Sequence, residues 1–191
     1  MRLSQSDADF ETRFQALISA KRGIAEDVEA VVRAIVDDVK SRGDAALIDY
    51  TEKFDRVRLT ADRLAIGPEE LAAAEKAVGP NERAALTLAR DRIAAHHRRQ
   101  MPADDRYTDA LGVELGTRWT AIEAVGLYVP GGTAAYPSSV LMNAVPAKVA
   151  GVERIAIVTP TPDGKPNPLV LAAARLAGVD EVYRVGGAQA I

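Results

Sequence analysis

One pattern in the second half of the chain constrains the fold more than any other feature. Short apolar runs alternate with helical patterns, and glycine or proline stands in the turns between them. In chain order these segments cover residues 126–129, 138–150, 154–158, 168–177 and 181–185. Strands that alternate with helices through short loops form a parallel sheet with right-handed crossovers. The sequence therefore predicts an α/β fold.

Glycine-rich turns follow the first and third of these runs, at residues 130–132 and 186–187. The loops after parallel strands gather at one edge of the sheet, where ligands bind. Glycine lets a backbone approach a ligand closely, and a helix start offers unpaired amides to a phosphate or ribose. From local chemistry alone, the turn at residues 130–132 fits a tight turn that binds nothing somewhat better than a ligand site. The common dinucleotide fingerprint is not present, because the second run ends in Thr159 and Pro160 instead of an acidic residue, and Asp163 lies further on in a loop.

Two polar side chains at this edge are candidates for cofactor binding. Tyr128 lies near the end of the first run, where a ring packs against a planar ligand and a hydroxyl anchors it. The alternative is a core aromatic residue with its hydroxyl at the surface. Gln189 follows the second glycine pair and carries an amide that both donates and accepts hydrogen bonds. Its alternative is an ordinary cap or a solvent-facing residue.

The first half of the chain is predicted to be mainly helical. Apolar residues recur three and four apart, and proline or glycine separates several of the periodic segments. We expect helices at residues 7–20, 25–40, 44–54 and 81–100, another that begins at Pro68, a short strand at 64–66, and an antiparallel pair of residues 113–115 with 119–122. We divide the chain into a helical region, residues 1–106, and an incomplete Rossmann-like sheet domain, residues 107–191.

The composition excludes several classes of protein. The chain has 24 basic and 27 acidic residues, a net charge of −3, no basic tract and 5% aromatic residues, so we expect no nucleic-acid partner. It has no cysteine, which excludes a disulfide scaffold and a zinc ribbon within these residues. The uncharged stretch at residues 124–147 contains three prolines, so we expect no membrane span there. His96 and His97 are adjacent in a helix, point in different directions and belong to a basic, solvated face. No residue is assigned to acid–base chemistry or to a metal.

The third run is followed by only a few residues of what should be a third helix. Without that helix the strand leaves apolar surface in water, at about 25 cal/mol per Å². We therefore expect this chain to be the N-terminal part of a longer protein.

Four segments carry a resemblance to a known family. They read VGLYVPGGTA at residues 125–134, YPSSVLMNAVPAKVAGV at 136–152, AGVDEVY at 177–183 and VGGAQAI at 185–191. Together they resemble the histidinol dehydrogenase family. The resemblance is dense from Gly116 onward and weaker in the first half, where GDAA at residues 43–46 and TEKFD at 51–55 still fit.

The resemblance implies a cytoplasmic, homodimeric enzyme on a truncated Rossmann-like, aldehyde-dehydrogenase-like fold. The family oxidises L-histidinol to L-histidine through an aldehyde with NAD, the last step of histidine biosynthesis. A zinc ion holds the substrate, and a histidine and a glutamate handle protons. Tyr128 and Gln189 match the family's cofactor-contacting residues. The zinc ligands and catalytic residues are expected beyond Ile191, so the chain alone is expected to be inactive.

Two alternatives remain open at this point. One is a related NAD-dependent dehydrogenase that acts on another small polar alcohol, such as sulfopropanediol. The other is a non-catalytic nucleotide-binding or assembly module.

Overall fold

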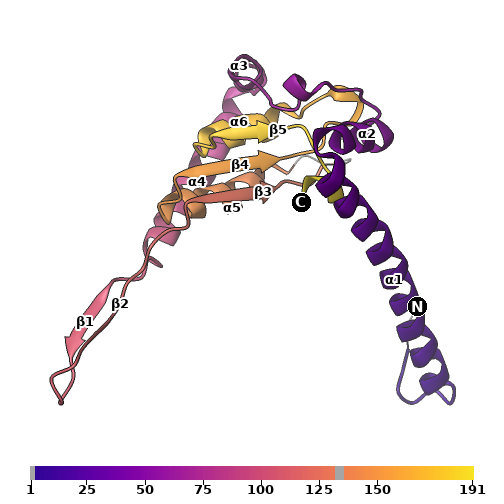
Figure 1. Ribbon diagram of the computed structural model, residues 1–191, viewed down its shortest axis with the longest axis horizontal. Helices are drawn as coiled ribbons and strands as arrows, with labels where there is room; N and C mark the ends of the chain where they lie inside the picture. The colour runs from indigo at the N-terminus through magenta and orange to yellow at the C-terminus, as the bar shows by residue number, and fades with distance from the viewer. Residues whose placement is uncertain (1–2, 132–135) are drawn as a thin grey trace.

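Three parallel strands form the centre of the molecule. The computed structural model describes residues 3–131 and 136–191, without the side chains of residues 20–27. The strands are β3 (Ala124–Tyr128), β4 (Arg154–Val158) and β5 (Glu181–Tyr183), and they lie side by side in that order. Helices α5 (Pro137–Val149) and α6 (Pro168–Leu176) connect them (Figure 1). The α/β fold with a parallel sheet, predicted from the sequence, is confirmed.

One face of this sheet packs against the helices. The register aligns Leu127, Ile157 and Val182 in one row across the three strands. All three contribute to a core that also takes side chains from α5 and α6. Because successive side chains of a strand point to opposite faces, Tyr128, the next residue after Leu127, points to the face away from these helices.

Helices α3 (Pro68–Ala77) and α4 (Pro80–Arg98) complete this core. Each begins with a proline. Proline has no amide proton, but the first turn of a helix has no partner for that proton in any case, so proline suits this position. Ala74 of α3 and Ala94 of α4 are buried in the same cluster as Val140 and Leu171 of the crossover helices. Helices from the first half of the chain therefore pack directly onto the sheet region, and the division at residue 106 stays a prediction.

The first two predicted helices are one helix. α1 (Phe10–Arg42) runs through the gap predicted between residues 20 and 25 and projects from the body of the molecule (Figure 1). That gap contains Gly23 but no proline, and a single glycine costs about 1 kcal/mol in a helix, which a long helix tolerates. Gly43, with a φ of 58°, separates α1 from α2 (Asp44–Asp55). Among the described residues, no helix combines the length and the apolar composition of a membrane span.

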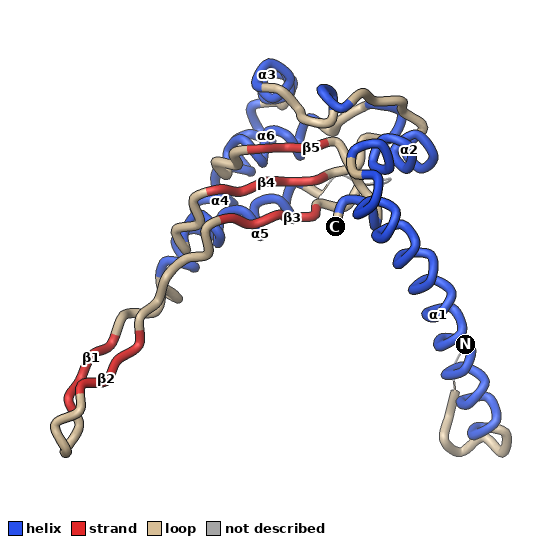
Figure 2. The backbone as a smooth tube through the Cα atoms, viewed as in Figure 1, coloured by secondary structure: helices blue, strands red, loops and turns tan. Residues whose placement is uncertain are grey.

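The prediction that residues 113–115 pair with residues 119–122 is also wrong. The hairpin pairs β1 (Asp105–Thr108) with β2 (Glu114–Thr117), and it forms a second arm away from the sheet (Figure 2). The carboxylate of Asp109 accepts hydrogen bonds from the amides of Leu111 and Val113. Because an aspartate favours such a turn, the chain reverses there and pairs with the polar segment before it.

The predicted strand at residues 64–66 is only a single antiparallel bridge. A short 3₁₀ turn, η1 (Ala61–Arg63), precedes it, and Ala65 then pairs with Tyr183. The amide of Arg184 donates a 2.9 Å hydrogen bond to the carbonyl of Leu64. β5 ends at Tyr183, two residues before the predicted end at residue 185.

Candidate functional site

The segments after the three strands meet at one edge of the sheet. Tyr128 is the last residue of β3, and Gly187 lies just beyond β5, directly before the 3₁₀ turn η3 (Ala188–Ala190). The backbone amide of Gly187 donates a 3.0 Å hydrogen bond to the hydroxyl of Tyr128. This bond joins the first strand to the segment after the third strand, across the end of β4.

Tyr128 combines an exposed ring with an anchored hydroxyl. It retains 39% of its exposure on the face of the sheet opposite α5 and α6. A tyrosine hydroxyl that accepts one hydrogen bond still has its own proton to donate. The side chain is therefore not a core aromatic residue, and its ring offers a planar surface beside the strand ends.

Gln189 is buried within η3. It is only 4% exposed, because α1 and α2 both contact η3, so the solvent-facing alternative is excluded. Within the described part of the chain its Oε1 has no hydrogen-bond partner, and a buried oxygen of this kind costs about 1–3 kcal/mol. Gly187 has a φ of +69°, and a Cβ there would lie 2.5 Å from this Oε1. Glycine at 187 therefore satisfies both the backbone conformation and the space beside Gln189.

Pro160 fills the space between the two glycine-rich segments. A Cβ added to Gly131 or to Gly186 would overlap the Pro160 ring. A cavity of about 310 Å³ lies beside Pro160. It is lined by residues 130–131, 159–160, 162, 165–168 and 170. A larger hollow of about 630 Å³ lies at the start of α4, away from the strand ends. Gly132, the last residue of the predicted turn, lies outside the described residues.

The loop between β4 and α6 ends in a helix cap. The side chain of Asn167 accepts a 3.0 Å hydrogen bond from the amide of Leu169, which satisfies one of the free amides of the first turn. Earlier in this loop, Asp163 accepts two hydrogen bonds from Arg56, at 2.9 and 3.2 Å. The guanidinium holds the pKa of Asp163 below its usual value. Asp163 is thus committed to an ion pair with Arg56, the residue that caps the C-terminus of α2.

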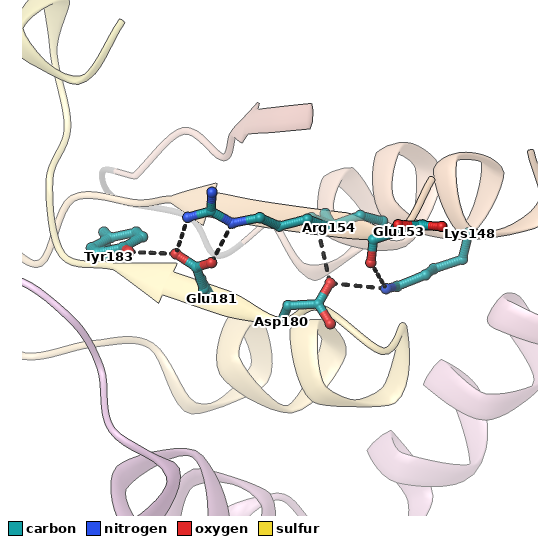
Figure 3. Close-up of polar contacts among 7 residues, drawn as sticks. Lys148, Glu153, Arg154, Asp180, Glu181 and Tyr183 are labelled. Atoms are coloured by element: carbon teal, nitrogen blue, oxygen red, sulfur yellow. Dashed lines mark hydrogen bonds and ion pairs between the residues drawn. The ribbon is translucent and has the colours of Figure 1, made fainter. Parts of the chain in front are cut away.

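Polar groups at the start of the strands fasten the opposite edge of the sheet, and sequence reasoning missed them. The carboxylate of Asp180 accepts bonds of 2.9 Å from both the Lys148 ammonium and the Ile155 amide (Figure 3). Lys148 lies at the end of α5, so this contact ties a crossover helix to two strands. The signal in the sequence is weak, because the three residues are 7 to 32 positions apart along the chain.

A second network lies beside the first. Arg154 donates two hydrogen bonds to Glu181, at 2.6 and 3.0 Å, and the Tyr183 hydroxyl donates a third at 2.5 Å (Figure 3). These contacts lower the pKa of Glu181 to about 2, with the bond from Arg154 as the largest cause. These side chains are occupied by one another, which leaves the other end of the strands as the candidate ligand edge.

The two histidines form no metal centre with their neighbours. His96 and His97 lie edge to face on α4, with their ring centroids 5.2 Å apart. Across residues 3–131 and 136–191, no three histidine, cysteine, aspartate or glutamate side chains are grouped so as to hold a metal ion.

A parallel sheet with crossover helices on one face and glycine-rich strand ends defines a class of protein. It is the class of α/β proteins that bind small ligands beyond the carboxyl ends of the strands. Residues 19–191 match the family model described as histidinol dehydrogenase. The chain belongs to the histidinol dehydrogenase family.

Individual relatives agree with this assignment. The chain is 65% identical over 189 residues to histidinol dehydrogenase from Brucella abortus (strain 2308), and 65% identical over 191 residues to that from Bradyrhizobium diazoefficiens. These alignments cover 99% and 100% of this chain and 44% of each relative. The crystal structure of histidinol dehydrogenase from Elizabethkingia anophelis superposes with a TM-score of 0.81 at 34% identity, over 85% of this chain and 37% of that one. The chain thus spans less than half the length of the curated relatives that it matches.

Proposed function

We propose that the whole protein oxidises L-histidinol to L-histidine with NAD. The name of its relatives, histidinol dehydrogenase, supports the oxidation of histidinol. The chain described here supplies the first part of that enzyme. The observation that carries the proposal is the hydrogen bond between Gly187 and Tyr128, because it assembles an exposed aromatic ring and a buried amide oxygen beside the strand ends.

In this proposal Tyr128 and Gln189 bind and orient the cofactor. NAD, when bound, would supply the hydride acceptor, one molecule for the alcohol and a second for the hydrated aldehyde, whose added oxygen comes from water. The ring of Tyr128 packs against a planar part of the cofactor, and its hydroxyl keeps one proton to donate. The Oε1 of Gln189 gains a donor from the cofactor, which relieves the cost of an unpaired buried oxygen.

The residues described here do not fit a zinc site. They contain no cluster of three suitable ligands, so no step of the reaction is assigned to a metal on this part of the chain. Zinc-dependent binding of substrate, a homodimeric state and a cytoplasmic location are proposed for the whole protein from its family alone.

The test is the reduction of NAD by the intact protein. L-Histidinol should produce NADH, and Tyr128→Ala and Gln189→Ala should each raise the KM for NAD at least about tenfold. Leu111→Ala, an exposed position on the hairpin, is the control and should change nothing. A protein that uses sulfopropanediol and not L-histidinol would support the related alcohol dehydrogenase instead. A protein that reduces NAD with neither would refute the proposal.

A further inference from the structure

The two glycines that follow β5 have no side chains to hold them in place. Gly186 lies against the ring of Pro160. Gly187 donates a 3.0 Å hydrogen bond to the Tyr128 hydroxyl and has a φ of +69°. A glycine backbone has a wider conformational range than that of any other residue. The position of the Gly187 amide therefore depends on how the chain is held where it leaves the sheet.

Arg184 is the residue at which the chain leaves the sheet, one position after the end of β5. Its backbone amide donates a 2.9 Å hydrogen bond to the carbonyl of Leu64. Its guanidinium donates a 2.5 Å hydrogen bond to the Glu70 carboxylate and lies 3.5 Å from the carbonyl oxygen of Ala65. Glu70 and Ala65 are 114 and 119 positions away along the chain. Arg184 thus fastens the end of β5 to α3 and to the segment that leads into it.

The guanidinium of Arg184 is buried, and its burial is costly. The Arg184 side chain is 4% exposed, whereas that of Glu70 is 42% exposed. Within the part of the chain that the structure describes, the Nε of Arg184 has no hydrogen-bond partner. A buried ion pair is often no more stable than apolar residues of similar volume. Stability alone therefore gives little reason for a guanidinium at this position.

The guanidinium provides direction, which an apolar side chain does not. Val185, the next residue, is buried with Leu59 and Leu64, but apolar contacts are non-directional. They keep Val185 beside the sheet and leave the course of the following glycines open. Glu70 is a well-placed acceptor for Arg184, because it lies in the first turn of α3, where the helix dipole favours negative charge.

We propose that Arg184 is a positioning residue: bonded to Glu70, its guanidinium sets the direction in which the chain leaves β5 and thereby holds the Gly187 amide against the Tyr128 hydroxyl. Arg184 itself does not contact the cofactor. This inference rests on the proposed function, since Tyr128 belongs to the proposed cofactor site.

The test compares two variants of the intact protein with a matched control. Arg184→Met removes the guanidinium and keeps much of the apolar stem. Arg184→Lys keeps a positive charge, and because only one guanidinium nitrogen bonds to Glu70, an ammonium can replace it. The control is Arg175→Met, which breaks a 2.7 Å ion pair between the end of α6 and Glu75 of the same helix α3.

Two measurements separate local positioning from general stability. Hydrogen–deuterium exchange without ligand follows the Gly187 amide, with the amide of Ile157, buried in β4, as internal reference. Calorimetry gives the dissociation constant for NAD. Arg184→Met should speed exchange at Gly187 at least about tenfold and leave Ile157 within about twofold. It should also weaken NAD binding at least about tenfold, because small misplacements of binding groups are costly.

The other two proteins should differ little from the wild type. Arg184→Lys should stay within about threefold of it in both measurements, because its ammonium keeps a charge-assisted bond to Glu70. Arg175→Met should match it, since exposed ion pairs contribute little.

Several results would overturn the inference and leave the proposed function intact. One is unchanged exchange at Gly187 in Arg184→Met. Another is equal acceleration at Gly187 and Ile157, which reports general destabilisation. A third is NAD binding that stays normal while exchange at Gly187 rises, and a fourth is an Arg184→Lys protein as impaired as Arg184→Met. A wild-type protein that does not bind NAD would instead refute the proposed function, and exchange at Gly187 would still decide whether Arg184 holds this amide.

Glu70→Gln covers the case in which Arg184→Met does not fold. It changes the exposed partner of the pair and keeps an acceptor oxygen. Because a hydrogen bond to an uncharged acceptor is about half as strong, exchange at Gly187 should rise about threefold with no change at Ile157. Unchanged exchange at Gly187 in this variant would overturn the inference.

Discussion

The amide of Gly187 donates its hydrogen bond to the hydroxyl of Tyr128 across 59 positions of sequence and past the end of an intervening strand. The bond closes the edge of the sheet at which the proposed cofactor site lies. It also fixes the direction of the Tyr128 hydroxyl, so one substitution separates the role of the hydroxyl from that of the ring.

Tyr128→Phe removes this bond and keeps the ring. The Gly187 amide is then free to bind water, because Gly187 is exposed, so the free energy of unfolding should fall by no more than about 1 kcal/mol. Exchange of the Gly187 amide hydrogen should become faster, as measured by hydrogen–deuterium exchange. Tyr107→Phe, on the exposed hairpin, is the control. An unchanged exchange rate at Gly187 would mean that the bond does not protect this amide.

Gly186→Ala should destabilise the protein by about 1–3 kcal/mol, because the new methyl group overlaps the rigid Pro160 ring. Gly126→Ala is the matched control, since no atom lies within 4 Å of a Cβ at that position. Urea unfolding measures both variants. Equal stability of the two would show that the edge adjusts to a side chain at residue 186.

Asn167→Ala should cost about 1 kcal/mol, because it removes the acceptor for the first turn of α6. Asn167→Asp keeps the acceptor and should preserve stability. Asn81→Ala lies inside the first turn of α4, where no side-chain cap is present, and provides the control. Thermal unfolding of the three variants checks this prediction, and a loss as large for Asn81→Ala as for Asn167→Ala would contradict it.

The ion pair between Arg154 and Glu181 should make stability depend on pH in the acid range. The pKa of Glu181 is lowered from 4.5 to about 2, so the folded state binds its proton less readily than the unfolded chain does. The stabilising contribution is therefore complete above about pH 4.5 and is lost as the pH falls towards 2. Arg154→Met should raise the pKa of Glu181, as followed by NMR of its carboxyl carbon. A Glu181 pKa that does not rise in Arg154→Met would show that Arg154 is not its main cause.

The sequence by itself determined the parallel sheet and its two crossover helices. Apolar runs of strand length, separated by proline-started helices and glycine turns, leave few other arrangements, and the three predicted strands all exist. The same local chemistry identified Tyr128 and Gln189 as residues at the strand ends. Their role in binding a cofactor stays a prediction.

Only the tertiary structure decided which distant groups meet. The hydrogen bond between Gly187 and Tyr128 and the contacts of Pro160 with Gly131 and Gly186 have no strong signal in the local pattern. Each depends on packing between segments far apart in the chain, where hydrogen bonds and burial outweigh local preference. Periodicity reports which face of an element is buried, but it does not report what that face is buried against.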